Sequence, residues 1–481
     1  MRYISTRGRA PALGFEEALL TGLAPDGGLY VPETWPTLSG PEIRALAGLP
    51  YAEGVFRIMR PFVGPAIPED DLGALLVEAY AGFDHPAVAP LKQLDPRIWL
   101  LELTHGPTLA FKDYALQVLG RLFDYLLARR GEKVTIVGAT SGDTGSAAIE
   151  ACRDREAIDI FILHPKGQVS EVQRRQMTTV DSDNVFNIAI EGSFDDCQDL
   201  LKALFNDTAF RDEMNLSAVN SINWARIVAQ IAYYMIAGAA LGAPERAVAF
   251  AVPTGNFGNV YAAYAAGRMG LPLAKLIVGS NRNDILARFF ETGAMTVAGV
   301  EPSLSPSMDI QISSNFERLL LDLYDGDGAA VAVAMAGFRA SGSLDLGPAR
   351  GRRALELFAA ARCDDAGTLA EIARVYRETG VLVDPHTAIG IAAAREQAGS
   401  VPDPQAPIVA VATAHPAKFP DAVARATGVR PALPPYLADL LERPERLTVL
   451  PNDLAQVSDF VRAHARPGPR MQGRGRRMGA A

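Results

Sequence analysis

The stretch VTIVGATSGDTGSAAIEACRD, residues 134–154, reads as a β-strand, a glycine-rich loop and a helix in direct succession. Its first part is the short β-branched and apolar run of a buried strand, and its last part has helical periodicity. The same order recurs where AVAFAVP (247–253) precedes TGNFGN, and where IVAVAT (408–413) precedes AHPAKF. Strands and helices that alternate through such loops predict parallel α/β sheets.

The 481 residues are 49% hydrophobic and 21% charged, which is enough for several packed lobes. Strand-loop-helix units begin near Leu91, whereas helix-like segments such as DLGALLVEAYAGF (71–83) dominate before it. We therefore expect a mainly helical lobe at 1–90 and two open, twisted α/β lobes within 91–465. The tail 466–481, RPGPRMQGRGRRMGAA, has too little apolar surface to order itself and is expected to be disordered. A solvated extension fits it better than a segment that binds RNA or anionic surfaces.

Charge and cysteine content restrict the class of protein. The 46 basic and 55 acidic residues give a net charge of −9, which argues against a nucleic-acid partner. Cys152, Cys197 and Cys363 lie far apart without metal-ligand spacing, so we expect neither a disulfide framework nor a metal site. The N-terminus lacks the apolar core of a signal peptide, so a cytoplasmic location is expected. The apolar tract from Ile227 is interpreted as a buried helix and not as a membrane span.

The loop TGNFGN, residues 254–259, leaves a predicted strand and enters a helix. Free N–H groups at a helix start bind anions, with the helix dipole in support. Gly255 and Gly258 let the main chain approach a phosphate closely, and the asparagines can add amide donors. A phosphate cup and an ordinary glycine-rich turn both fit these residues.

Two further loops carry anion-binding chemistry. SGDTG (141–145), together with Thr140, gathers hydroxyl and amide groups suited to a carboxylate, although Asp143 or Ser141 could equally cap the helix. NSINWARI (220–227) places an amide, a hydroxyl and the guanidinium of Arg226 at the head of an apolar helix. A phosphate suits that set, because the planar arginine fork donates two hydrogen bonds. An exposed arginine at a helix start is the alternative.

One lysine, Lys112, directly follows a short apolar run within HGPTLAFKDYALQ, residues 105–117. Most lysines are solvated. A partly desolvated lysine holds its proton less tightly and can react with an aldehyde. Pyridoxal phosphate has an aldehyde, and its phosphate requires a glycine-rich cradle.

Together these motifs resemble threonine synthase, a pyridoxal-phosphate enzyme of the tryptophan-synthase-β, or fold type II, group, and in particular the branch shared by fungi and many bacteria. The resemblance covers nearly the whole chain before the tail. Its motifs are YISTRG (3–8), LAPDGGLYVPE (23–33), HGPTLAFKD (105–113), ATSGDTGSAAI (139–149), NSINWARI (220–227), VPTGNFGN (252–259), SSNFERLL (313–320), VDPHTAIG (383–390) and TAHPAKF (413–419).

The resemblance implies that Lys112 joins the cofactor's aldehyde and that Thr413 faces its pyridine nitrogen. Asp143 stands near the cofactor's 3′ oxygen, where other branches carry an asparagine. An acidic group there requires that it or the cofactor's phenolate carry a proton. The residues implied for the cofactor's phosphate are Gly255, Asn256, Phe257, Gly258 and Asn259.

The implied substrate is O-phospho-L-homoserine, which loses phosphate by β,γ-elimination and gains water at Cβ, with Lys112 as the base. The residues implied for this substrate are Thr140, Ser141, Gly142 and Thr144 for its carboxylate, and Asn220, Ser221 and Arg226 for its phosphate. The oligomeric state stays open between monomer and homodimer.

Two other functions stay open. A serine/threonine dehydratase or a cysteine synthase has the same fold but does not need a second phosphate grip. A silent binding protein would not need Lys112. We expect His105, His386 and His415 to support packing and hydrogen bonding near the site and not catalysis. Asn315 and Arg318 could reach the site or begin a surface helix.

Overall fold

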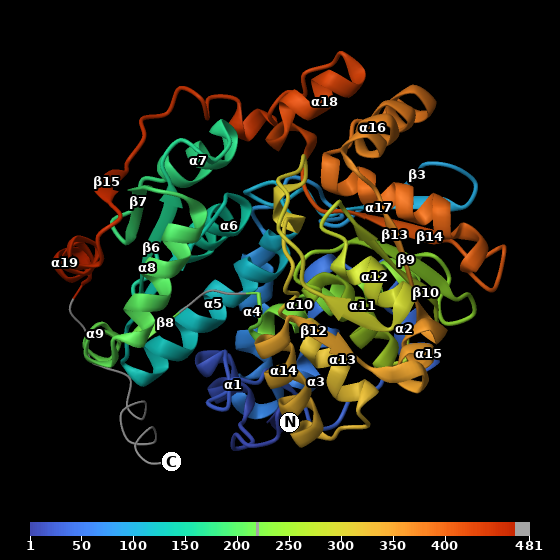
Figure 1. The fold of residues 1–481 in the computed structure, drawn as a ribbon, viewed down its shortest axis with the longest axis horizontal. Helices are drawn as coiled ribbons and strands as arrows, with labels where there is room; N and C mark the ends of the chain where they lie inside the picture. The colour runs from blue at the N-terminus through green and yellow to red at the C-terminus, as the bar shows by residue number, and fades with distance from the viewer. Residues whose placement is uncertain (218–220, 467–481) are drawn as a thin grey trace. The chain divides into compact units, whose positions relative to one another are not determined.

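The computed structural model describes residues 1–217 and 221–466. The chain forms two compact units, each made of two segments (Figure 1). The first unit is Met1–Ala115 with Ser221–Pro431, and the second is Leu116–Asn220 with Ala432–Ala481. Each unit contains a mainly parallel sheet with helices, which confirms the α/β prediction. Most of the predicted tail, 467–481, lies outside the described residues.

The first unit is built on a six-stranded sheet in the order β13-β10-β9-β14-β4-β3. Its strands are β3 (Leu91–Gln93), β4 (Ile98–Glu102), β9 (Val248–Pro253), β10 (Leu273–Ser280), β13 (Phe358–Arg362) and β14 (Ile408–Ala412). Neighbours pair in parallel, except that β3 pairs antiparallel with β4. Every residue of β9 and β14 is buried, as expected for parallel strands covered on both faces.

Helices pack on both faces of this sheet. Ala249 and Ala251 of β9 belong to one apolar cluster with Ala393 of α17. Phe250 lies between them and points to the other face, where its ring centre is 4.9 Å from that of Tyr234 in α10. The helices after the first ninety residues are α10 (Trp224–Ala240), α11 (Gly258–Arg268), α12 (Ile285–Thr292), α13 (Phe316–Leu323), α14 (Gly328–Ser341), α15 (Gly347–Leu357), α16 (Asp365–Thr379), α17 (Pro385–Glu396) and α18 (Pro420–Thr427). A short antiparallel pair, β11 (Ala294–Thr296) with β12 (Ser343–Asp345), completes the unit.

The first ninety residues are mainly helical, with one short antiparallel pair of strands. Their elements are β1 (Tyr3–Ser5), α1 (Phe15–Thr21), β2 (Tyr30–Pro32), α2 (Gly40–Arg44), α3 (Tyr51–Val63) and α4 (Glu69–Tyr80). Helix α3 buries Val55, Ile58 and Phe62 at helical spacing and packs against α10. Residues on both sides of position 90 belong to the first unit. A separate N-terminal lobe therefore stays a prediction.

The second unit contains a fully parallel five-stranded sheet, ordered β15-β7-β6-β5-β8. Its strands are β5 (Val134–Ala139), β6 (Ile158–Pro165), β7 (Val185–Glu191), β8 (Leu216–Ser217) and β15 (Thr448–Pro451). Its helices are α5 (Lys112–Arg130), whose first four residues belong to the first unit, α6 (Asp143–Cys152), α7 (Glu171–Thr178), α8 (Phe194–Asn206), α9 (Thr208–Met214) and α19 (Leu454–His464). Arg466, the last described residue, donates to the carboxylate of Asp159 in β6.

The apolar tract from Ile227 forms most of helix α10, and nearly all of its side chains are buried. The prediction of a buried helix is confirmed. Across 1–217 and 221–466, no helix combines the length and apolar character that a membrane span requires.

Candidate active site

Three predicted site segments follow three neighbouring strands of the first unit. TGNFGN follows β9, Thr413 follows β14, and the loop that ends at Lys112 follows β4. These strands are adjacent and parallel, so their carboxyl ends lie at one edge of the sheet. Ligands of open α/β sheets bind at that edge.

The loop before Lys112 is paired with the segment after β14. The Phe111 N–H donates to the Thr413 carbonyl at 3.0 Å, and the His415 N–H donates to the Leu109 carbonyl at 2.9 Å. Leu109 holds a left-handed φ of 64°, which is unusual for a branched side chain and marks a tightly determined turn. Lys112 opens helix α5 and is 8% exposed. The structure therefore brings Lys112 and Thr413 together and confirms that the lysine is largely desolvated.

The loop TGNFGN turns sharply into helix α11. Phe257 adopts a left-handed φ of 60°, and α11 begins at Gly258. Asn259 is buried, and its Oδ1 accepts hydrogen bonds from the hydroxyls of Tyr233 at 2.5 Å and Tyr234 at 2.7 Å. Its buried Nδ2 has no hydrogen-bond partner among the described residues. The helix start and this unused donor both suit an anion.

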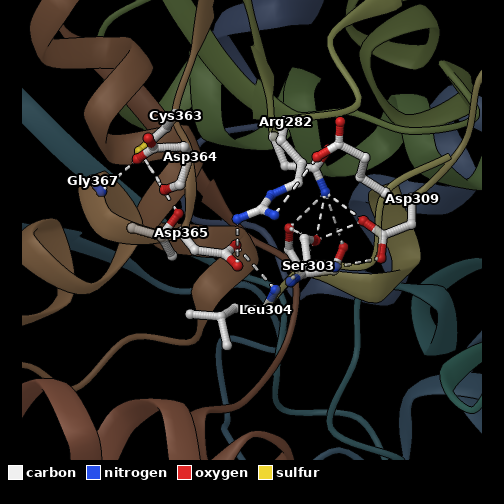
Figure 2. Close-up of polar contacts among 12 residues, drawn as sticks. Arg282, Ser303, Leu304, Asp309, Cys363, Asp364, Asp365 and Gly367 are labelled. Atoms are coloured by element: carbon white, nitrogen blue, oxygen red, sulfur yellow. Dashed lines mark hydrogen bonds and ion pairs between the residues drawn. The ribbon is translucent and has the colours of Figure 1, made fainter. Parts of the chain in front are cut away.

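A neighbouring loop closes over Gly255. A Cβ on Gly255 would lie 2.8 Å from the Ser307 carbonyl oxygen. Figure 2 shows the network that fixes this loop: Ser303 binds Asp309 through its Oγ at 2.6 Å and its N–H at 3.0 Å, and the Leu304 N–H donates to Asp365. Arg282 also bonds Asp365, at 2.9 Å. The segment that packs against Gly255 is thus held both by Asp309 within it and by Asp365 outside it.

We expect Gly255→Ala to lower the free energy of unfolding by about 1–3 kcal/mol, because the new methyl group overpacks against backbone. Cofactor affinity, measured by titrating pyridoxal phosphate into apoprotein, should fall with it. Gly337→Ala is the matched control: Gly337 lies inside α14, and a Cβ added there would have open space for 4 Å among the described residues. That change should stabilise the protein by about 0.5–1 kcal/mol. Equal effects of the two variants would contradict the steric argument.

Arg226 is a buried cation near the start of α10. It is 3% exposed, and burial lowers the pKa of its guanidinium to about 10. Within 1–217 and 221–466, no group accepts a hydrogen bond from its Nε or Nη1. Burying a charge without a partner is expensive, so these donors indicate a site for an anion. The exposed-arginine alternative is wrong.

The other members of the predicted phosphate grip lie beside the glycine loop or outside the described residues. Ser221 Oγ lies 3.4 Å from Ser314 Oγ, which in turn donates to Asn256 Oδ1 at 3.4 Å. The hydroxyls therefore connect the Arg226 segment to TGNFGN. Asn220 lies outside the described residues.

SSNFERLL supplies supporting residues whose role the sequence did not decide. Ser313 Oγ donates to the Gly255 carbonyl at 2.7 Å, and Asn315 Nδ2 donates to the Asn256 carbonyl at 2.9 Å. Arg318 is fully buried and donates to the carbonyls of Tyr30 and Ile222. Asn315 and Arg318 thus brace the loops and do not begin a surface helix. The sequence signal for this supporting role was the run of three polar residues, Ser313 to Asn315, directly before the apolar helix α13.

The predicted carboxylate loop lies in the second unit, between β5 and α6. Thr140 Oγ1 accepts from the N–H groups of Gly142 at 3.0 Å and Gly145 at 2.9 Å, so Thr140 stabilises this turn, and the N-cap residue of α6 is Gly142. Asp143 is buried, and its Oδ1 accepts from Gln173 Nε2 at 2.8 Å. Ser141 is exposed and Thr144 half-buried. The roles assigned to this loop stay predictions.

The three histidines have structural partners. His105 Nδ1 lies 2.7 Å from Asp84 Oδ1, and His386 Nδ1 lies 2.7 Å from Asp384 Oδ2. His415 Nδ1 accepts from the Ala417 N–H at 3.1 Å. These contacts agree with supporting roles.

His415 makes stability depend on pH. Burial lowers the pKa of His415 to about 4, so the folded protein binds this proton more weakly than the unfolded chain does. Stability is fully present above the unfolded pKa of about 6.5 and is lost as pH falls from there towards 4. His415→Asn, which can keep the acceptor, should remove up to about 3 kcal/mol of this pH dependence. Urea unfolding at pH 7 and pH 4.5 measures it.

His85→Asn is the matched control for the loss of an imidazole, since His85 Nδ1 also accepts from the N–H two residues later, at 3.1 Å. An unchanged pH slope in His415→Asn would contradict the assignment.

The chain matches three family models, described as "Threonine synthase N terminus" at residues 2–80, "Pyridoxal-phosphate dependent enzyme" at 84–338 and "Threonine synthase, C-terminal" at 387–461. A threonine synthase of Pseudomonas aeruginosa is 58% identical and aligns with 97% of this chain and 99% of that protein.

Two solved structures have the same fold over nearly their whole length. The crystal structure of PLP-bound threonine synthase from Brucella melitensis is 54% identical with a TM-score of 0.95, covering 97% of this chain and 100% of that one. The yeast threonine synthase structure is 37% identical with a TM-score of 0.92, covering 96% and 98%.

Proposed function

Because the chain belongs to the threonine synthase family, we propose that it converts O-phospho-L-homoserine and water to L-threonine and phosphate, with pyridoxal 5′-phosphate held on Lys112. The observation that supports the assignment of residues is the meeting of a desolvated lysine, Thr413 and TGNFGN at one sheet edge. Arg226 is buried near the start of α10, and Ser221 of the same segment connects to Asn256 through Ser314.

The residues at this edge suit the cofactor. The helix start at Gly258 and the Asn259 amide offer donors to its phosphate, and the close contact of Gly255 with Ser307 leaves no room for a side chain at position 255. The Thr413 hydroxyl is the group assigned to the pyridine nitrogen. Lys112, which burial keeps from bulk water, is the amine that joins the aldehyde.

Different residues are assigned to the two anionic groups of the substrate, its phosphate and its carboxylate. Arg226 and Ser221 take the phosphate, since the buried guanidinium has donors to give. The loop from Thr140 to Thr144 is assigned to the carboxylate on the family resemblance, and so is Asn220 to the phosphate. A substrate without a phosphate would leave the Arg226 cation uncompensated, which costs binding energy.

The chain's own groups move the protons. Pyridoxal phosphate, when bound, withdraws electrons from the carbon that bears the amino group and so makes its proton acidic. The Lys112 amine removes that proton at Cα and one at Cβ, and it returns protons to Cγ after phosphate has left and to Cα after water has added. Arg226 stabilises the charge on the phosphate as its bond to Cγ breaks. Water supplies the hydroxyl at Cβ, and the products are threonine and phosphate.

A serine/threonine dehydratase remains the second candidate, because it shares the lysine and the glycine loop. It does not require the Arg226 site. The deciding experiment is an assay of phosphate release from O-phospho-L-homoserine with amino-acid analysis of the product, run beside threonine and O-acetylserine as substrates. Release of phosphate with formation of threonine is expected. Ammonia and a keto acid from threonine at a higher kcat/KM would instead identify a dehydratase.

We also infer a cytoplasmic enzyme of the aspartate-family pathway that acts on small molecules as a monomer or homodimer. All three cysteines are free thiols, which agrees with a reducing compartment. Fractionation of cells and light scattering of the purified protein test the location and the oligomeric state.

A further inference from the structure

A second lysine is buried in the first unit, and the proposed reaction does not use it. Lys418 is 0% exposed and lies in the short 3₁₀ turn Pro416–Lys418, five residues after Thr413. Its Nζ donates to the Thr108 carbonyl at 2.6 Å. Thr108 belongs to the loop that leads to Lys112, so this ammonium ties together the two segments that carry Lys112 and Thr413.

The same loop buries a carboxyl group next to Lys112. Asp113 is 0% exposed and accepts from Thr108 twice, from Oγ1 at 2.5 Å and from N–H at 2.9 Å. A Cβ on Gly106 would lie 2.5 Å from Asp113 Oδ2, so only glycine fits against the carboxylate. Burial raises the pKa of Asp113 to about 6, while Thr108 and the positive charge of Lys418 oppose that rise. The buried carboxylate is therefore stabilised first by the Thr108 hydrogen bonds and next by the positive charge of Lys418, which itself bonds to the Thr108 carbonyl.

We propose that Lys418 is a positioning residue for Lys112, which acts by compensating the Asp113 carboxylate and by holding the Thr108–Asp113 loop against the segment after Thr413. The proposal rests on the proposed function of Lys112. Lys418 itself needs no contact with cofactor or substrate.

The chemistry explains why a charge is needed at this place. A buried carboxylate without an opposite charge is strongly unfavourable, and the chain can relieve it only by taking up a proton or by opening the loop. Opening the loop moves Lys112, because Lys112 directly precedes Asp113. The loop is joined to the segment after β14 by two backbone hydrogen bonds, one from Phe111 N–H to the Thr413 carbonyl and one from His415 N–H to the Leu109 carbonyl. If both charges are removed, however, no buried charge remains uncompensated, and the loop has no reason to open.

The test compares Lys418→Met, Asp113→Asn and the double variant. Titration of pyridoxal phosphate into each apoprotein, followed by the absorbance of the lysine-bound cofactor, should show that Lys418→Met weakens binding about tenfold to a hundredfold, as expected when one member of a buried charged pair is lost. The double variant should recover most of this loss, and Lys418→Arg should retain more affinity than Lys418→Met. Lys275→Met is the matched control, because Lys275 Nζ also donates to backbone carbonyls, those of Leu355 and Glu356.

Two results would overturn the proposal. The first is a double variant that binds the cofactor no better than Lys418→Met does, or a double variant that fails to fold as Lys418→Met also does. A role in packing alone predicts this result, because the losses of the two single variants would then add. The second is a Lys418→Met protein with wild-type affinity. Borohydride reduction and peptide mass mapping of wild-type protein distinguish this failure from failure of the proposed function. Cofactor trapped on Lys418 in place of Lys112 would overturn both, whereas cofactor trapped on Lys112 together with either result above would overturn the positioning role of Lys418 alone.

Discussion

Lys112→Ala is expected to abolish the covalent attachment of pyridoxal phosphate and to lower kcat for phosphate release by about 10²–10⁴-fold or more, the range for loss of a positioned acid-base group. The reason is that the amine has two tasks at one place, the link to the aldehyde and the transfer of protons. Its burial at the start of α5, held by the pairing of Phe111 with Thr413, fixes both. Borohydride trapping followed by peptide mapping gives the readout that does not depend on activity.

The control is Lys275→Ala, which removes a lysine of the same unit whose Nζ donates to the backbone carbonyls of Leu355 and Glu356. This change should leave trapping and kcat unaltered. Exogenous methylamine should restore part of the activity of Lys112→Ala if a missing amine is the defect. Trapped cofactor that persists in Lys112→Ala would refute the assignment.

Arg226→Met is expected to act in opposite directions on function and stability. The KM for O-phospho-L-homoserine should rise by about two orders of magnitude, because a buried charged contact with the phosphate is lost. The free energy of unfolding of the apoprotein should rise by about 1 kcal/mol or more, because the cation has unsatisfied donors when no anion is present. Steady-state kinetics and urea unfolding, with and without inorganic phosphate, measure the two effects.

Arg374→Met provides the comparison, since Arg374 lies on the surface of α16 and pairs with Glu378 one turn away. Loss of such a pair should change stability by less than about 1 kcal/mol and leave KM unaltered. If Arg226→Met weakened cofactor binding and substrate binding equally, Arg226 would belong to the cofactor's site and not to the substrate's.

The sequence predicted well those features that depend on neighbouring residues. Strand, glycine loop and helix follow one another in TGNFGN because each is encoded locally, and the apolar approach of Lys112 correctly indicated burial. The α/β class followed from the same periodicity. The parallel order of the sheet then placed Lys112, Thr413 and TGNFGN at one edge.

Features that depend on distant pairing could not be read in this way. The sequence left open whether Arg318 reaches the site or begins a surface helix, and the structure shows that it donates to carbonyls of Tyr30 and Ile222, which are far away in the sequence. Lys418 carries no local sign of its contact with Thr108. The division of the chain into two units, each with two segments, likewise depends on long-range contacts.

The strand order also has a consequence for synthesis on the ribosome. Strand β14 is the last of the six strands to be made, yet it lies between β9 and β4 in the finished sheet. Until Ile408–Ala412 has emerged, β4 and β9 each lack a partner on that side, and a nascent chain displays two open edges that invite aggregation. A chain truncated before residue 408 should therefore bind chaperones and no vitamin B6, however complete its lysine and glycine motifs are.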